Sequence, residues 1–508
     1  MSSFYALQQA NRALLDDETG TIIKEAHHRL ALVYPSPYRT AMSSLGYQLV
    51  YRVVNELPDW SAERAMLPED IAAYRKARVP LFTMESEQPV SNFDVIAFSL
   101  AYELEITGVF DCLDLSGLAV RSADRLESDP LVIIGGPLTF SNPVPAGPFA
   151  DVVVMGEGEE LIIQILECVS SGTSKDEVLQ FAAKLPGVWV PAIHGERLLP
   201  VAAADNQKLP AYGQIITPNT ELSNMHLVES ERGCHRKCTF CVMRRSTNGG
   251  MRLASPEAIL ASIPEHAQRV GLVGAAVSDH PKLIQIVESI VALGKGVGLS
   301  SLRADRMTPE LVELLVRGGY RTLTVASDGA SERIRQQLEK VIKEEHLLYT
   351  AQLAAQYNIR TYKMYMMVGV PGETDDDISE LIEFSKEIAK IVPTALGIAP
   401  FVSKRNTPLD RTEFAGIKVV EQRLERLRKE LRGQVDVRAT SARWAWVEWA
   451  MAQGGYDMAD AAEAAWRKGG GFADWKRAIR EHQREVQMPP EELRLGRPTG
   501  RFTEEIPY

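Results

Sequence analysis

The sequence lacks the features that mark membrane and secreted proteins. No apolar run among its 508 residues approaches the roughly 18 residues that a membrane span needs. The N-terminal stretch MSSFYALQQANRALLDDETG has no basic segment followed by an apolar one, which argues against a signal peptide. The 5 cysteines are odd in number and three of them are clustered, which does not suit a disulfide framework. These absences predict a protein of the reducing cytoplasm.

An excess of positive charge is also missing. The formal net charge is −11, so the chain as a whole repels nucleic acid, and no nucleic-acid partner is indicated. Hydrophobic residues make up 45% and charged residues 24%, as in ordinary globular proteins. A chain of this length exceeds what one core usually supports, so we expect two or three domains.

The first half alternates short apolar strands with amphipathic helices. We expect strands at 30–34, 62–67, 94–99, 131–136 and 151–156, with helices near 41–56, 103–116 and 157–171. This alternation predicts an α/β domain with a parallel sheet covered on both faces, a doubly wound, Rossmann-like arrangement. We place this domain at residues 28–171, after an N-terminal extension at 1–27.

Ligands of doubly wound domains bind beyond the carboxyl ends of the strands. Gly135 and Gly136 would let a flat or bulky ligand approach the backbone closely, although they could also be tight-turn glycines with no ligand. The candidate binding residues at these strand ends are Ser36, Tyr38, Ser99, Tyr102, Gly135, Gly136, Pro137, Gly156, Glu157 and Gly158.

A second alternation follows an irregular connecting segment, residues 172–222, with some strand content. Strands are expected at 227–232, 270–276, 297–305, 322–327, 361–370 and 394–402, with helices between them. Repeated units of this kind predict a partial (β/α) TIM-type barrel over residues 223–433. Residues 434–508 are expected to form a small, Trp-rich helical region and an extended tail.

Three cysteines stand in the stretch ERGCHRKCTFCVMRR, in the loop after the first strand of the second half. Cys234, Cys238 and Cys241 have C-x3-C-x2-C spacing. Three thiolates can each bind one iron of a [4Fe–4S] cluster and leave the fourth iron open to a substrate or cofactor. Zinc is the alternative, with His235 as fourth ligand, but His235 directly follows Cys234, which makes joint ligation awkward. The other cysteines, Cys112 and Cys168, are expected to be buried on helices.

These cysteines, with the aromatic Phe240 before the last, resemble the signature loop of the radical S-adenosylmethionine (SAM) superfamily. The resemblance implies a [4Fe–4S] cluster whose open iron chelates the amino and carboxylate groups of SAM. It also implies cleavage of SAM to methionine and a 5′-deoxyadenosyl radical, with an electron from an external donor of the flavodoxin or ferredoxin type.

The resemblance extends to the other strand ends of the second half. The family usually has a Gly-Glu pair after the second strand that holds the amino group of SAM. Here GAAVSDHP stands in that place, so Ser278 and Asp279 would do this work. Further SAM contacts are expected from Phe240, Ser301, Arg303 and Asp328, and from the backbone of Val368, Gly369 and Val370 at the adenine. The alternative for each is a structural role; Asp328 and Thr374, for example, could be helix N-caps.

A doubly wound domain that ends in GGP and FADVVVMGEGEE, upstream of such a barrel, resembles the cobalamin-binding subfamily of these enzymes. The likeness covers roughly residues 28–410. The Asp-x-His-x-x-Gly loop by which other cobalamin proteins donate a histidine to cobalt is absent, and PSPYRTAMSSLG follows the first strand instead. Any bound cobalamin is therefore expected to lack a histidine ligand from this loop.

The resemblance implies a cobalamin-dependent methyltransferase acting on an unactivated carbon of an unidentified small-molecule or peptide substrate. Two alternatives remain open. One is a radical cyclisation, rearrangement or sulfur insertion without methyl transfer, and the other is a non-catalytic iron–sulfur or cobalamin sensor. Arg244 and Arg245, which follow the cysteines, would either lie on a solvated surface or complement the charge of the cluster or of an acidic substrate.

Overall fold

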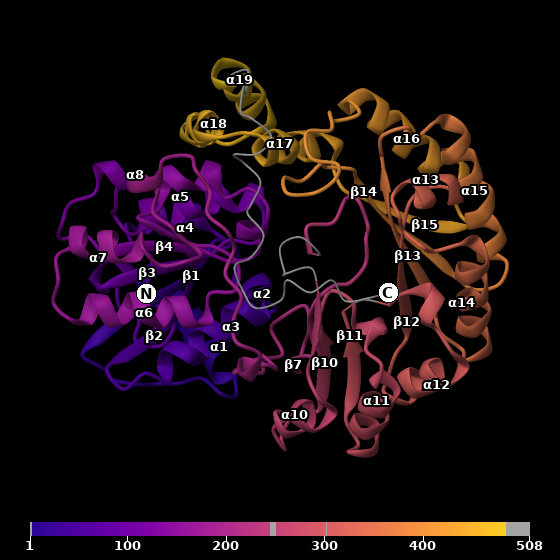
Figure 1. Cartoon of the computed structure of the whole chain (residues 1–508), viewed down its shortest axis with the longest axis horizontal. Helices are drawn as coiled ribbons and strands as arrows, with labels where there is room; N and C mark the ends of the chain where they lie inside the picture. Colours follow the sequence, from indigo (N-terminus) through magenta and orange to yellow (C-terminus); the bar gives the residue numbers. More distant parts are fainter. Residues whose placement is uncertain (1–2, 244–249, 301, 484–508) are drawn as a thin grey trace. The chain divides into compact units, whose positions relative to one another are not determined.

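The computed structural model describes residues 3–243, 250–300 and 302–483, which divide into two compact units. The first unit holds the described residues up to His226 and those from Ala450 onward. The second holds those from Leu227 to Trp449. Figure 1 shows the helices and strands of both. The chain therefore leaves the first unit near residue 226 and returns to it near residue 450.

The first unit is built on one six-stranded sheet in the order β2-β1-β3-β4-β5-β6. The first five strands are parallel. This order has the flavodoxin-like pattern, in which the topological switch lies between β1 and β3. The predicted doubly wound fold is confirmed. The strands are β1 (His28–Tyr34), β2 (Trp60–Met66), β3 (Val95–Ser99), β4 (Leu131–Gly135), β5 (Val152–Val154) and β6 (Val188–Trp189), and the helices include α1 (Ser3–Asp16), α3 (Leu45–Asn55), α5 (Ile106–Leu115) and α6 (Glu159–Ser170).

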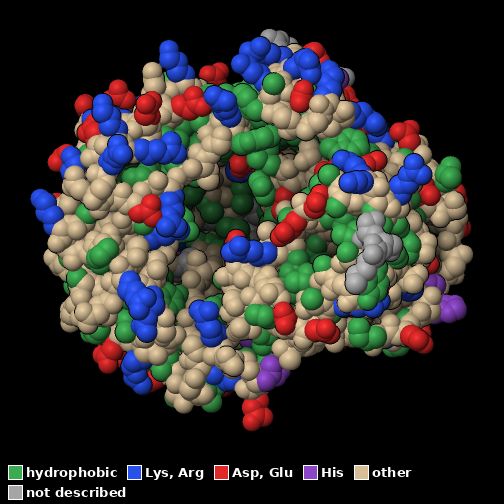
Figure 2. Space-filling view, turned by 180° about the vertical axis from the view of Figure 1, so that it is seen from behind, with side chains coloured by type: hydrophobic (Ala, Val, Ile, Leu, Met, Phe, Trp, Pro, Cys, Tyr) green, Lys and Arg blue, Asp and Glu red, His purple; other side chains and the backbone are tan. Residues whose placement is uncertain are grey.

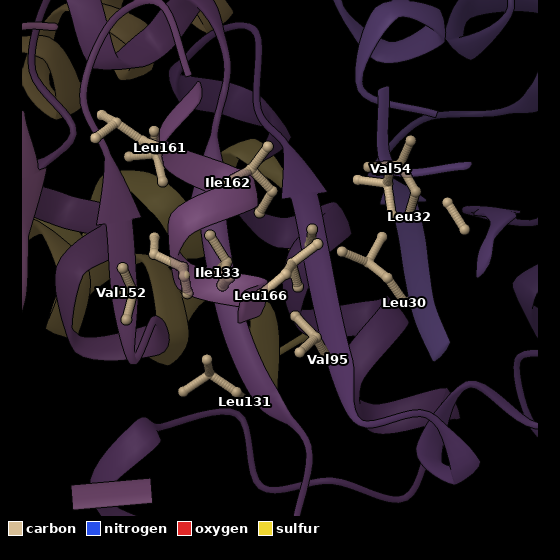
Figure 3. Close-up of a cluster of buried hydrophobic side chains, with 14 of the residues drawn as sticks. Leu30, Leu32, Val54, Val95, Leu131, Ile133, Val152, Leu161, Ile162 and Leu166 are labelled. Atoms are coloured by element: carbon tan, nitrogen blue, oxygen red, sulfur yellow. The ribbon is translucent and has the colours of Figure 1, made fainter. Parts of the chain in front are cut away.

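The core of this unit lies between the sheet and helices α3 and α6. Leu32 lies beside Val54 of α3, and Ile133 lies near Ile162 and Leu166 of α6 (Figure 3). Val33, which faces the other side of the sheet, is also fully buried, as expected for a parallel sheet covered on both faces. Each such side chain contributes about 1.5–3 kcal/mol by leaving water.

Two segments that we expected outside the doubly wound domain belong to this unit. Strand β6, from the expected connecting segment, pairs antiparallel with β5. Helices α18 (Tyr456–Arg467) and α19 (Phe472–His482) also fold with it. The Trp466 indole donates to Asp111 on α5 at 3.0 Å, and Arg121 pairs with Asp460 at 2.7 Å. The boundaries expected at 171 and 434 thus differ from those of the structure.

The second unit contains a partial barrel, as predicted. A three-stranded sheet, β11-β10-β7, and a four-stranded parallel sheet, β12-β13-β14-β15, are linked by a parallel bridge between Leu302 and Val325. The strands are β7 (Met225–Glu229), β10 (Arg269–Val273), β11 (Gly296–Leu299), β12 (Thr322–Asp328), β13 (Thr361–Val368), β14 (Thr394–Pro400) and β15 (Val435–Ala439); the helices include α10 (Pro256–Ala261), α11 (Leu283–Ala292), α12 (Pro309–Arg317), α13 (Glu332–Gln337), α14 (Glu344–Gln356), α15 (Asp375–Ala389) and α16 (Ile417–Glu430).

The last strand of the barrel, β15, was missed. It pairs with β14 from Val435 to Ala439, beyond the end expected at residue 433. Its sequence VDVRA alternates apolar and charged residues, and the two charged side chains are exposed, as suits an edge strand. Helix α17 (Ala442–Gln453) follows and leads the chain back to the first unit.

The surface carries both signs of charge. Figure 2 shows Lys and Arg side chains scattered among Asp and Glu on the visible face, without one continuous basic field. In the described part of the chain, no helix combines the length and the apolar character that crossing a bilayer requires.

Candidate functional site

Three free thiols lie on one loop at the end of the first barrel strand. Strand β7 is followed by the short strand β8 (Glu231–Gly233), and Cys234, Cys238 and Cys241 come directly after it. All three are partly exposed and none is in a disulfide. Burial raises the pKa of each thiol, that of Cys241 to about 11, where the other two thiols raise it further. Thiolates on this loop therefore need a bound cation to be stable.

The cysteine loop is tied to the second half of the barrel. The Thr239 N–H donates to the Leu338 carbonyl at 3.0 Å, and the Thr239 carbonyl accepts from the Leu409 N–H at 3.3 Å. Phe240 packs against a small core that includes Leu338 and Phe401. The aromatic residue before the last cysteine thus anchors the loop, and its contact with SAM stays a prediction.

Asp279 holds the cysteine loop to the end of β10. Its side chain is 1% exposed, and Arg236, which lies between the first two cysteines, binds both of its oxygens, one of them at 2.8 Å. Arg306 lies 3.1 Å away, with Arg303 and His235 at 4.0 and 3.9 Å. Burial opposes ionisation, but the bonds and charges of these arginines lower the pKa of Asp279 overall. Asp279 is therefore ionised and already paired with arginine.

Ser278 and Arg303 meet across the ends of β10 and β11. The Ser278 hydroxyl accepts from the Arg303 N–H at 3.0 Å, and Arg303 Nη2 donates to Asp305 at 3.0 Å. The buried Arg303 Nε makes no hydrogen bond, which leaves one donor for an anionic group. Ser301, Arg244 and Arg245 lie outside the described residues.

Asp328 ends β12 with φ +64° and forms an ion pair with the nearly buried Lys340. It is not a helix cap, because Ser331 fills that position for α13. The charge of Lys340 partly offsets the rise in the pKa of Cys238. Thr374, by contrast, is the N-cap residue of α15. The Asp328–Lys340 pair thus contributes to the electrostatic environment of the cysteine loop.

The end of β13 offers backbone rather than side chains. Val368 and Val370 are buried. Gly369, with φ +86°, donates its N–H to Glu373 at 2.9 Å, and Glu373 also accepts from Arg423 at 2.7 Å. Burial raises the pKa of Glu373 to about 7. This arrangement fixes the backbone of the segment predicted to meet the adenine, a contact that stays a prediction.

Two family models match the chain. The model described as "Radical SAM proteins, N-terminal" matches residues 46–191, and the model of the radical SAM superfamily matches residues 228–385. The chain belongs to the radical SAM superfamily. Membership implies a [4Fe–4S] cluster and SAM as cofactors.

Several known proteins are similar to this chain over about four fifths of its length. An uncharacterized protein of Methanocaldococcus jannaschii is 25% identical over 417 residues, covering 78% of this chain and 83% of that protein. The radical SAM methyltransferase TsrM from Kitasatospora setae, solved with tryptophan substrate and a SAM analog, matches with a TM-score of 0.52 at 12% identity over 78% of this chain and 76% of its own. The apo structure of the cobalamin-dependent SAM radical enzyme OxsB has a TM-score of 0.51 at 14% identity, over 80% and 55%. At these identities the two solved structures establish a shared fold.

The N-terminal unit of this radical SAM protein joins its strand ends at the topological switch. The Ser36 hydroxyl donates to Glu105 at 2.9 Å, and the Ala101 N–H donates to the same carboxylate at 2.7 Å. Glu105 thus connects the loops after β1 and β3. Ser99 is partly exposed and Tyr102 is exposed.

The glycines at these strand ends differ in what surrounds them. A Cβ added at Gly135 would meet nothing closer than 3.8 Å, whereas one at Gly136, with φ +102°, would lie 2.8 Å from the Leu100 backbone. At Gly156 it would lie 2.7 Å from the Ala202 carbonyl. Gly136 and Gly156 are therefore required by the chain's own packing, whereas Gly135 would accept a Cβ at ordinary van der Waals distance from Val154.

The remaining strand-end candidates are engaged in the fold. Tyr38 donates to Glu18 at 2.6 Å, and burial followed by the charge of Glu18 raises its pKa. Glu157 accepts from the Ala204 N–H at 2.8 Å. Pro137 begins a short 3-10 turn, and a Cβ at Gly158 would lie 2.8 Å from Val154. Their contacts with cobalamin stay predictions.

One residue was missed, although it stands three positions before the first cysteine. Glu231 is 1% exposed, and its Oε1 accepts from the Ala276 N–H at 2.6 Å. Its Oε2 is buried and accepts no hydrogen bond from any residue that the structure describes. Burial, followed by the charges of Glu229 and Asp279, raises the pKa of Glu231 to about 7. Only the fold reveals it, because its partner is 45 residues away in sequence.

Proposed function

We propose that this radical SAM protein is a cobalamin-dependent methyltransferase that acts on an unactivated carbon. The observation that carries the proposal is the loop of three free thiols at the barrel-strand ends. Within the described ranges, no three His, Cys, Asp or Glu side chains are grouped to hold a metal ion. A loop with three thiolates suits a cubane, in which each thiolate binds a separate iron and the fourth iron stays open.

The residues around the loop fit a bound SAM. When bound, the cluster would supply the electron that cleaves SAM to methionine and a 5′-deoxyadenosyl radical. Arg303, with a free buried donor, would bind the carboxylate, and the backbone of Gly369 and Val370 would contact the adenine. Ser301 would bind the ribose. Asp328 and Phe240 would complete the SAM site from the barrel side and from the cysteine loop.

Each methyl transfer would consume two molecules of SAM and two electrons. The radical takes one hydrogen atom from the substrate carbon and leaves as 5′-deoxyadenosine. Methylcobalamin would supply the methyl group and be remethylated by the second SAM. The products are then methylated substrate, 5′-deoxyadenosine, methionine and S-adenosylhomocysteine. A flavodoxin- or ferredoxin-type protein of the cytoplasm would supply the electrons.

Support for cobalamin comes from the first unit. Its flavodoxin-like sheet has small or open residues at the strand ends, Ser36, Ser99 and Gly135, with Tyr102 exposed beside them. The loop after β1 holds no histidine. OxsB, which has a similar fold, is described as cobalamin-dependent, and TsrM as a methyltransferase. Bound cobalamin should therefore lack an axial histidine from this loop.

The test is an anaerobic visible spectrum of reconstituted full-length protein with and without added hydroxocobalamin, followed by mass analysis of products. Cluster absorbance, a cobalamin spectrum that stays with the protein on gel filtration, and formation of both 5′-deoxyadenosine and S-adenosylhomocysteine are expected. Absence of cluster absorbance in the reconstituted protein would refute the proposal, because radical formation depends on the cluster.

A second candidate function is radical chemistry without methyl transfer, such as a cyclisation or rearrangement. It is favoured by the packing at Gly136, Gly156 and Gly158, where the space that a cofactor would need is filled by the chain itself. Formation of 5′-deoxyadenosine without S-adenosylhomocysteine, and no retention of cobalamin, would select this function.

A further inference from the structure

The ammonium group of SAM needs an anionic partner near the cysteine loop, and Asp279 is poorly suited to that role. Arg236 already binds both of its oxygens, with Arg306 at 3.1 Å and Arg303 at 4.0 Å. An ammonium placed beside this carboxylate would meet the repulsion of these arginines. One strand-end carboxylate of this region, that of Glu231, has no ion pair with any described residue.

We propose that Glu231 receives the α-ammonium of SAM. This inference rests on the proposed SAM-dependent function. Glu231 lies on β8, three residues before Cys234, and forms no ion pair in the described structure. Its buried Oε2 has no partner. An unpaired carboxylate oxygen away from water is costly, and a charged donor such as an ammonium removes that cost.

The residues around Glu231 also offer a partner for the α-carboxylate of SAM. Glu231 bonds to Ala276 at one end of the turn after β10, and the Arg303 N–H bonds to Ser278 near the other. Among the described residues, a carboxylate oxygen and a guanidinium Nε that both lack a hydrogen bond thus flank one short turn. The α-amino and α-carboxylate groups of the methionine moiety have the same two charges.

The turn packs directly onto the carboxylate. A Cβ added at Gly274 would lie 2.1 Å from Glu231 Oε1, so glycine is needed there for the carboxylate to keep its place. Because Glu231 is only 1% exposed, SAM reaches Oε2 only when this turn shifts. Gly274→Ala therefore perturbs the same contact while keeping the charge.

The test measures binding of SAM to anaerobically reconstituted full-length protein by equilibrium dialysis. Glu231→Gln keeps the shape but presents an amide in place of the anion, and should weaken SAM binding about 10- to 100-fold, the effect of losing a hydrogen bond between charged groups. Gly274→Ala should weaken it in the same direction. Iron content should match the wild type in both variants.

Two controls separate this role from a structural one. Glu229→Gln changes a neighbouring carboxylate that is already paired with Arg232 at 2.7 Å, and should leave SAM binding unchanged. 5′-Methylthioadenosine lacks the amino-acid moiety, so Glu231→Gln should not alter its affinity. Equal SAM binding by Glu231→Gln and wild type, or equal losses for SAM and 5′-methylthioadenosine, would overturn the inference. Absence of SAM binding by the wild type would instead refute the proposed function.

Discussion

Replacing Asp279 by Asn should release the cysteine loop from the barrel. Asparagine keeps the volume but loses the charge that balances Arg236 and Arg303. These arginine side chains are 19% and 9% exposed, against 1% for Asp279, so their interactions are largely desolvated. Removing one partner of a buried pair costs about 3–5 kcal/mol. Arg306 is 51% exposed and adds little. We expect the free energy of unfolding to fall by about 3 kcal/mol, near the lower end of this range.

The assay is urea unfolding of the apo protein, followed by circular dichroism, together with the rate at which a chelator strips iron from the reconstituted protein. Asp279→Asn should lower the unfolding midpoint and speed the loss of iron. Asp436→Asn is the matched control, because its pair with Arg438 is exposed on both sides, and it should change the stability by less than about 0.5 kcal/mol. Wild-type stability and iron retention, together with weaker SAM binding, would refute the anchoring role and show that Asp279 holds the ammonium.

Three further predictions concern the cluster, cobalamin and acid stability. Cys238→Ala should abolish the visible absorbance of the cluster and SAM cleavage, whereas Cys168→Ala, on α6, should change neither; full iron content in the first would contradict the assignment. Gly135→Leu should abolish binding in a hydroxocobalamin titration and leave iron unchanged, because the backbone at this position accepts a Cβ without a clash; unaltered binding would show that cobalamin binds elsewhere. Burial would raise the pKa of Asp377, but the bond from Arg333 and its other donors lower it to about 2. Its stabilisation is therefore present above the unfolded pKa and lost as pH falls, by about 1 kcal/mol between about pH 5 and about pH 3. Urea titrations should show this part of the loss absent in Asp377→Asn, and an equal acid loss in both proteins would contradict it.

The sheet and the cysteine loop could be predicted because their signals are local. Buried parallel strands such as β1 need apolar side chains on both faces, and the resulting short runs are visible in the sequence. The three cysteines lie within eight consecutive positions. Cys168 shows the limit even here, because it lies on a helix as expected but is partly exposed rather than buried.

The partners of distant segments could not be predicted. Periodicity indicates that one face of α18 is buried but does not say which unit covers it. The same holds for individual side chains. Asp279 has a motif position that suits a ligand, yet arginines from two loops meet on it. Glu231 lies in a short strand, and its contact with Ala276 is formed only by the fold.

The return of the chain to the first unit has a consequence for synthesis on the ribosome. Asn142 donates its side-chain amide to the carbonyls of Ala452 and Gly454, at 3.0 and 2.8 Å, more than 300 residues later in the chain. The surface around Asn142 therefore stays exposed until the barrel and the segment after it have been translated. Closing so long a loop is slow, and exposed intermediates aggregate. A fragment that ends near residue 226 should need help from chaperones, or from helices α17 to α19 supplied as a separate peptide.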